Sequence, residues 1–113
     1  MSKPATHRAL FALVQSFLTE YLPLQRGASP HTVRAYRDAL KLLFEFVANL
    51  RRRSVASLEL TDLDADAVAG FLDQIESGRS NAASTRNCRR AAIRSFFKHL
   101  VRNDRKRPLT TTA

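Results

Sequence analysis

The sequence of 113 residues has the length of one domain and supports a single core of modest size. Hydrophobic residues make up 44% of it and charged residues 26%, and both shares lie close to globular averages, so the composition excludes extensive disorder. The longest apolar region, residues 40–50, is interrupted by Lys41 and Glu45 and is too short for a membrane span. The first twenty residues show no secretory signal, and a cytoplasmic protein is therefore expected.

The formal net charge of +9 is concentrated in the last third of the chain. Residues 1–78 contain nine basic and nine acidic side chains, whereas residues 79–113 contain ten basic side chains and a single acidic one, Asp104. An ordinary solvated surface mixes both signs, so this imbalance indicates that one end of the molecule faces a polyanion. The alternative, a solvated arginine-rich face that continues into a basic tail, stays open on composition alone.

Two amphipathic helices are predicted in the first half of the chain. The first is expected to end where Pro23 is followed by Gly27. The second begins at Ser29, a favourable N-cap, with Pro30 in the first turn, where its missing N–H costs nothing. The predicted core face of the first helix consists of Leu10, Phe11, Val14, Phe17, Leu18 and Tyr21, and that of the second of Val33, Tyr36, Leu40, Leu43, Phe44, Val47 and Leu50.

A connector and a third helix follow. Leu58, Leu60 and Leu63 are expected to close the end of a helical bundle. Asp64 is predicted to cap the third helix, in which Gly70 costs about 1 kcal/mol relative to Ala unless another helix packs closely against it. The predicted buried face consists of Val68, Phe71, Leu72 and Ile75.

A fourth helix is predicted after Gly78, with Asn81, Ser84 and Thr85 as equally suitable N-caps. Only its second half has a full apolar face, so the turns from Ser84 to Arg90 are expected to project beyond the bundle. That apolar face consists of Ile93, Phe96, Phe97 and Leu100. Residues 104–113 are polar and basic and predict a linker or tail.

The sequence offers little for catalysis. It has no glycine-rich phosphate loop, no paired carboxylates and no Cys/His/Asp set with nucleophile spacing. The three histidines His7, His31 and His99 lie on different predicted elements. Cys88 is the single cysteine, and we expect it to be an ordinary reduced thiol. No catalytic residue, metal ion or cofactor is therefore predicted.

Nucleic-acid binding is better supported, because the second and fourth helices both begin with hydroxyl side chains, free amides and arginines. A helix N-terminus attracts phosphate through its unpaired N–H groups and its dipole, and arginines add charge and directed hydrogen bonds. Arginine also reads guanine, and asparagine reads adenine, in the major groove. The candidate DNA-binding residues are Thr32, Arg34, Arg37, Lys41, Ser84, Thr85, Arg86, Asn87, Arg89, Arg90 and Arg94.

Three segments resemble the core-binding domain of tyrosine recombinases of the phage-integrase and Xer type. "SPHTVRAYRDALKLLFEFV" is similar to the second helix of that domain, "LTDLDADAVAGFLDQI" to the third and "STRNCRRAAIRSFFKHL" to the fourth. Each segment alone is a weak match, but the three together in the right order make a fairly specific one. The resemblance covers residues 8–103, and the matching positions are Ser29, Thr32, Tyr36, Asp38, Leu40, Arg94, Phe97 and Leu100.

The resemblance implies an all-α, four-helix SAM-like bundle over residues 1–103 that clamps duplex DNA at a recombination site through its second and fourth helices. Other recombinase subunits on the DNA are implied as partners, and the isolated domain is expected to be monomeric. The family's catalytic arginines, lysine, histidines and nucleophilic tyrosine belong to a second domain, which is expected after the linker of residues 104–113. This chain by itself is therefore expected not to be an enzyme.

One short segment matches a sequence motif of the family's catalytic residues. His31 and Arg34 stand in a His-x-x-Arg pattern with Tyr36 nearby, but all three fall within the predicted second helix, and Tyr36 belongs to its core face. No catalysis by these residues is expected. The alternative function is a helical protein–protein interaction module whose basic face binds an acidic partner.

Overall fold

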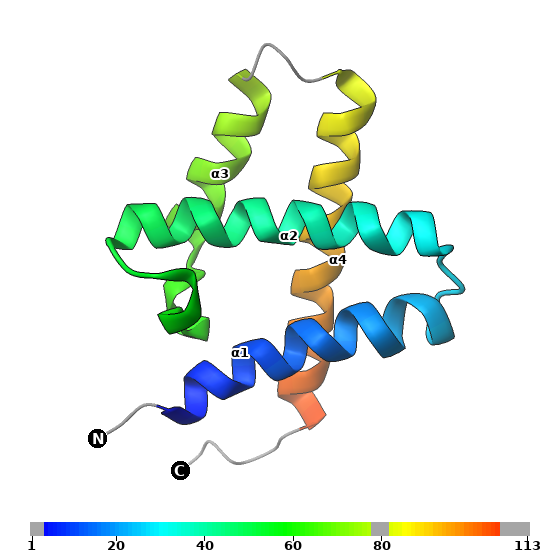
Figure 1. Cartoon of the computed structure of the whole chain (residues 1–113), viewed down its shortest axis with the longest axis horizontal. Helices are drawn as coiled ribbons and strands as arrows, with labels where there is room; N and C mark the ends of the chain where they lie inside the picture. Colours follow the sequence, from blue (N-terminus) through cyan, green and yellow to red (C-terminus); the bar gives the residue numbers. More distant parts are fainter. Residues whose placement is uncertain (1–3, 78–81, 107–113) are drawn as a thin grey trace.

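The computed structural model describes residues 4–77 and 82–106, with the side chains of residues 10–77 and 82–103. The described residues form helices and short connections and contain no strand, which confirms the all-α fold (Figure 1). None of the described helices is long and apolar enough to cross a bilayer. The helices are α1 (Pro4–Ser16), α2 (Pro30–Arg51), α3 (Ala65–Ser77) and α4 (Ala83–Lys106), with the π-helical segment η1 (Phe17–Gln25) continuing α1 and two 3₁₀ turns, η2 (Val55–Ser57) and η3 (Leu60–Asp62), between α2 and α3.

The first helix includes Pro23 and continues to Gln25, so it ends between Pro23 and Gly27, the two residues that were predicted to close it. Proline has no N–H to donate, and the wide π turns carry the helix across this gap, with the Arg26 N–H donating to the carbonyl of Tyr21 at 2.9 Å. Gly27 ends it with a φ of 66°, a conformation that glycine adopts without strain.

The start of α2 is as predicted. Ser29 accepts a hydrogen bond from the Thr32 N–H at 3.1 Å, and Pro30 occupies the first turn. The predicted core face is buried at Leu40, Leu43, Phe44 and Val47. The prediction that Leu50 and Phe11 belong to the core is wrong. Leu50 in the last turn of α2 is 52% exposed, and Phe11 in α1 is 42% exposed.

The connector closes one end of the core as expected, with Leu58 and Leu63 buried. Asp64 caps α3, because its Oδ1 accepts from the Ala67 N–H at 2.9 Å. Gly70 allows a close approach between α2 and α3, since a Cβ atom there would lie 3.3 Å from Cζ of Phe46. This contact explains why a glycine is tolerated inside α3.

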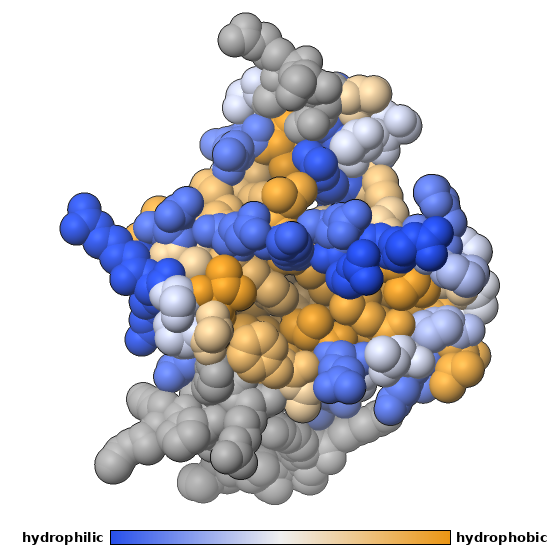
Figure 2. All heavy atoms as spheres, in the orientation of Figure 1, coloured by the Kyte–Doolittle hydropathy of each residue, from blue (hydrophilic) through white to orange (hydrophobic). Residues whose placement is uncertain are grey.

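The segment of α1 and η1 runs antiparallel to α2, and α3 and α4 cross behind α2 (Figure 1). α2 packs against α4, α3 and η1 and is the central helix of the molecule. The fully buried Phe96 of α4 lies edge-on to Phe17 of η1 at 5.3 Å and to Phe44 of α2 at 6.2 Å between ring centroids. On the face shown in Figure 2, hydrophilic residues form a band along α2, and apolar residues fill the space between α2 and α1.

α4 begins at Ala83, so Ser84 and Thr85 lie in its first turn and neither is the N-cap; Asn81 lies outside the described residues. The first turns extend beyond the crossing with α2, beside the end of α3 (Figure 1). The second half of α4 buries Ile93 and Phe96, whereas Phe97 is half-buried. The helix continues to Lys106, and residues 107–113 of the predicted tail are outside the described residues.

Candidate nucleic-acid interface

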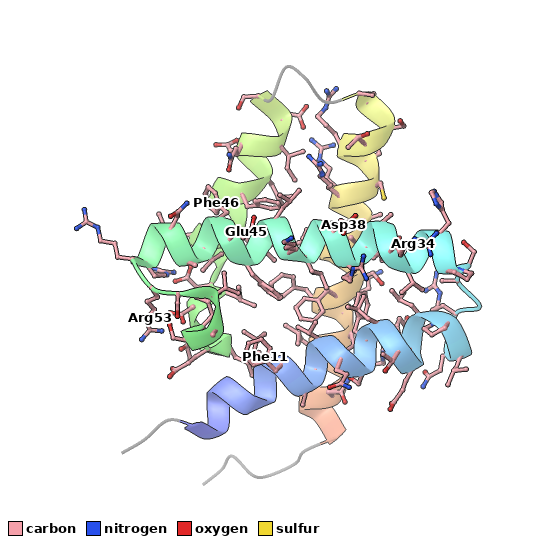
Figure 3. The ribbon with its side chains drawn as sticks, viewed as in Figure 1. Phe11, Arg34, Asp38, Glu45, Phe46 and Arg53 are labelled. Atoms are coloured by element: carbon pink, nitrogen blue, oxygen red, sulfur yellow. The ribbon has the colours of Figure 1, made fainter. Side chains whose placement is uncertain are left out.

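The first half of α2 presents the predicted binding residues of this helix at the surface. Arg34, which Figure 3 labels on α2, is exposed, and so is Lys41. The ion pairs among the described residues include neither of them. Arg37 lies 3.7 Å from its neighbour Asp38, an exposed pair that contributes little to stability. Thr32 is half-buried, and its Oγ1 accepts a hydrogen bond from Ser29 Oγ at 3.2 Å.

The first turns of α4 present the second group of predicted residues, some of them less accessible than expected. Ser84, Asn87 and Arg94 are exposed, whereas Thr85, Arg86, Arg89 and Arg90 are half-buried. Arg90 forms an ion pair with Glu76, so its guanidinium lies between α4 and α3. An arginine that is already neutralised in this way contributes less positive charge to the surface than its position in the sequence indicated.

A hollow of about 330 Å³ lies between α2 and the first turns of α4, and none of the predicted binding residues of α2 lines it. Ala35, Asp38 and Ala39 of α2 line one side, and α4 contributes the other side. The small side chains of Ala35 and Ala39 leave room at the crossing of the two helices. The α4 residues that line the hollow are Ser84, Thr85, Cys88 and Arg89.

Asp38 and Cys88 also line this hollow, although neither is among the predicted binding residues. Asp38 is only a matching position of the family resemblance, although its place between Arg37 and Lys41 on the exposed side of a helix is a signal that it lies on the same surface. Cys88 is a free, half-buried thiol, as expected for an ordinary cysteine.

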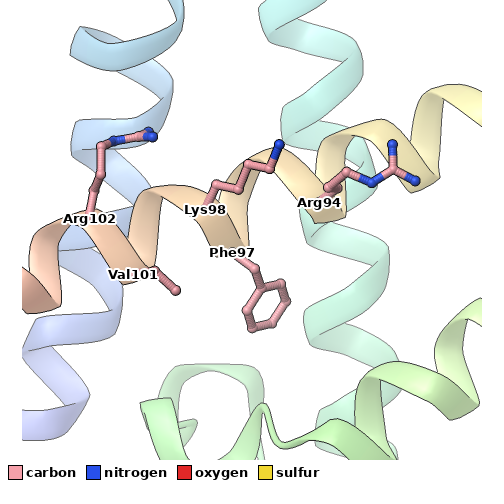
Figure 4. A pocket seen from close by; sticks show the side chains of 5 residues that line it. All are labelled: Arg94, Phe97, Lys98, Val101 and Arg102. Carbon is pink, nitrogen blue, oxygen red and sulfur yellow. The ribbon is translucent and has the colours of Figure 1, made fainter.

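Arg94 lies away from this hollow. It lines a second hollow of about 420 Å³ on α4, together with Phe97, Lys98, Val101 and Arg102. In Figure 4 the cationic side chains leave α4 on one side, and Phe97 and Val101 leave it on the other. Val101 is 54% exposed, so an apolar strip is flanked here by positive charge.

The arginines at the end of α2 are structural. Arg51 lies 2.8 Å from Asp64 and donates to the carbonyl of Asp62 at 3.2 Å, and Arg53 lies 2.6 Å from the Asp62 carboxylate (Figure 3). These pairs connect α2 to the connector and to the start of α3. They therefore neutralise part of a basic run that could otherwise be counted as binding surface.

The His-x-x-Arg string occupies the first turn of α2. His31 and Arg34 are exposed, whereas Tyr36 is half-buried, and its ring is stacked with Phe17 at 6.5 Å between centroids. Among the described side chains, no group of His, Cys, Asp and Glu residues could hold a metal ion.

A cluster of polar and aromatic side chains joins the segment of α1 and η1 to the second half of α4. The buried His99 lies with its Nε2 2.9 Å from Ser16 Oγ, and the guanidinium of Arg102 lies 4.5 Å from the ring centroid of Tyr21. Burial raises the pKa of the Tyr21 hydroxyl, but Arg26 and Arg102 outweigh it and hold this pKa below its usual value. This cluster is separate from both hollows except at Arg102.

The chain matches the family described as "Phage integrase, N-terminal SAM-like domain" over residues 14–104. A Sinorhizobium fredii protein that carries the name integrase/recombinase y4rD is 45% identical over 98 residues, which are 87% of this chain and 35% of that protein. A tyrosine recombinase XerC of Myxococcus xanthus is 37% identical over 94 residues, or 83% of this chain and 29% of the relative. Another XerC, from Thermodesulfovibrio yellowstonii, is 32% identical over 90 residues, or 76% of this chain and 26% of the relative. This chain thus spans about a third or less of these relatives, and no solved structure matches it significantly.

Proposed function

Because the chain belongs to the family of N-terminal SAM-like domains of phage integrases, which are tyrosine recombinases, we propose that it holds duplex DNA at a recombination site. The proposed contacts come from the first half of α2 and the first turns of α4. Such a role goes with a cytoplasmic location on the DNA and with other recombinase subunits as neighbours, and residues 104–113 would link this domain to the rest of the recombinase.

The observation that carries the proposal is the hollow between α2 and α4. It brings the second and third turns of α2 beside the first turns of α4, with Thr85 and Arg89 in its lining, and Arg34 directly precedes the lining residue Ala35 in sequence. Helix starts supply N–H groups and arginines supply charge for phosphate contacts, which position a protein on a duplex. Arg90 contributes indirectly in this proposal, because its ion pair with Glu76 fixes the direction of α4.

The experiment is a titration of duplex DNA with the chain at several salt concentrations. The logarithm of the affinity should fall linearly with the logarithm of salt, by about 0.9 units for each phosphate neutralised. Replacing Arg34 by Ala should lower this slope by roughly one unit and weaken binding to all sequences alike. The matched control Lys98→Ala removes one charge from the outer side of α4 and should leave the slope unchanged. Failure of the parent to bind duplex DNA would overturn the proposal.

A second candidate function is supported by the hollow of Phe97 and Val101. An apolar strip flanked by Arg94, Lys98 and Arg102 is the surface that an acidic, partly apolar protein segment would fit. Binding of such a segment would depend on Phe97 and Val101, whereas DNA binding through phosphates would not. Replacing Val101 by Asp therefore separates the two functions, because it should abolish protein binding and leave the Arg34-dependent DNA slope in place.

We propose that the cleavage and joining of DNA strands belongs to another part of the recombinase. Neither Tyr21 nor Tyr36 lines the hollow between α2 and α4, and Tyr36 is stacked with Phe17. Incubation of this chain with a nicked duplex substrate should therefore trap no covalent DNA adduct on either tyrosine. An adduct on Tyr21 or Tyr36 would overturn this part of the proposal.

A further inference from the structure

The hollow between α2 and α4 contains a hydrogen-bond acceptor and a donor on opposite sides. Asp38 contributes a carboxylate from α2, and Arg89 contributes a guanidinium from α4. Thr85 and Ser84 add hydroxyl groups, and Ala35 lets a partner approach. A site built only for phosphate would carry donors alone.

Asp38 is not explained by the fold. Its side chain is 69% exposed, and its described ion pair is the long contact of 3.7 Å with the neighbouring Arg37. It stands four residues after Arg34 and three before Lys41, so these three side chains share one side of α2. A carboxylate in this position repels phosphate, and it strengthens DNA binding only where the partner donates a hydrogen bond to it.

A G·C pair supplies both kinds of group at its major-groove edge. Cytosine presents the N4 amino donor, and guanine presents O6 and N7 as adjacent acceptors. The guanidinium fork matches the two guanine acceptors, and a carboxylate accepts from cytosine N4. Arg89 is half-buried at the crossing of the helices, which restricts the directions that its guanidinium can take.

We infer that the hollow between α2 and α4 reads one G·C base pair, with Asp38 on the cytosine and Arg89 on the guanine. This inference rests on the proposed DNA-binding function and assigns sequence specificity to one surface within it. Asp38 is thereby a specificity-determining residue, whereas Arg34 and Lys41, on the same side of α2, contact the backbone.

The test begins with selection of bound duplexes from a randomised pool by the parent chain. The parent should prefer G·C at one position by roughly tenfold or more over A·T in duplexes that differ only there. Asp38→Ala should weaken this preference, because only the Arg89 contact with guanine then remains, and it should bind the other duplexes as tightly as the parent or more tightly. Asp38→Asn should shift the preference at the same position toward A·T, because asparagine pairs with adenine N6 and N7.

Glu45→Ala is the matched control, because Glu45 is an exposed carboxylate on the same side of α2, seven residues after Asp38 and outside the hollow (Figure 3). It should keep the G·C preference. Arg89→Ala should also weaken the preference, at the same position that Asp38→Ala affects, and thermal unfolding should show that all variants fold.

Two outcomes would overturn the inference while leaving the proposed function intact. One is a parent that binds duplex DNA with no G·C preference at any position. The other is an Asp38→Ala variant that behaves like Glu45→Ala on every duplex, since Asp38 would then act only as a surface charge. A parent that binds no duplex DNA would instead overturn the proposed function and this inference together.

Discussion

Asp64 connects the start of α3 to the end of α2. Its Oδ1 accepts from the Ala67 N–H at 2.9 Å, and its Oδ2 lies 2.8 Å from Arg51 Nη2. The Ala67 N–H, and next to it the Arg51 guanidinium, hold the pKa of Asp64 below its usual value of 3.8. Both contacts favour the ionised carboxylate, and the unfolded chain lacks them.

The pKa of Asp64 predicts a change of stability in acid. Since this pKa is lower in the folded state than in the unfolded state, the ionised carboxylate stabilises the fold fully above the ordinary value of 3.8, and this contribution is lost as the pH falls through the folded-state pKa. Asp64→Asn keeps a capping acceptor but cannot titrate, so it should lose less stability in acid than the parent. Thermal unfolding at neutral and acidic pH measures this difference.

The control variant is Asp66→Asn. Asp66 is an exposed residue in the first turn of the same helix. Its acid sensitivity should follow that of the parent more closely than Asp64→Asn does. Equal pH dependence in the parent and in Asp64→Asn would contradict the prediction.

At the scale of elements, the crossing of α2 and α3 depends on Gly70. A Cβ atom at this position would lie 3.3 Å from Cζ of Phe46, a tight contact that a half-buried ring can relieve by a small shift. Phe46 also packs against Phe71 of α3 with 5.7 Å between ring centroids. The two helices therefore approach one another closely at Gly70, because this residue has no side chain between them.

Substitution at Gly70 should destabilise the protein in proportion to side-chain size. Gly70→Ala gains helix propensity and loses packing, so its net effect should be small. Gly70→Leu should cost about 1–3 kcal/mol, because α2 and α3 must separate. Ala69→Leu, on the exposed side of the same helix, should stay within about 0.5 kcal/mol, as measured by urea unfolding. If Gly70→Leu costs no more than Ala69→Leu, the helices are not in close contact at this point.

At the scale of the whole molecule, an aromatic cluster joins elements from both ends of the chain. Phe96 of α4 is fully buried against Phe17 of η1 and Phe44 of α2. Tyr36 extends the cluster through its contact with Phe17. The fold depends on these rings more than on Phe97, which is only half-buried.

Phe96→Ala should destabilise the protein by about 3–5 kcal/mol, because it removes a buried ring and leaves a cavity between three elements. Phe97→Ala should cost less, since part of that ring already contacts solvent. Denaturant unfolding measures both variants. DNA affinity of Phe96→Ala, measured where the variant is still folded, should remain close to that of the parent, and equal costs for the two variants would contradict the assignment of the core.

The isolated chain should be a monomer in solution. Its exposed large apolar residues are spread over α1, η1, α2, η2 and α4, and single exposed apolar residues are normal on soluble monomers. Sedimentation velocity at micromolar concentration should therefore show one species of monomer mass. A stable dimer would contradict this prediction.

The sequence by itself determined the helices and their local signals. Ser29 and Asp64 cap their helices as predicted, and Gly27 ends the first helical segment. The buried faces of α2 and α3 follow the apolar spacing. These features depend on contacts between residues a few positions apart, and such contacts can be derived from spacing and residue type. The family followed from the same segments.

Only the tertiary structure decided which side of each helix is covered by another helix. Helical spacing places Leu50 and Phe11 on apolar sides, but the packing of the helices leaves both exposed. The same crossings pair Arg90 with Glu76 and bring Asp38 beside Arg89. Contacts between distant segments depend on how whole helices pack, and no local pattern in the sequence encodes which residues then meet.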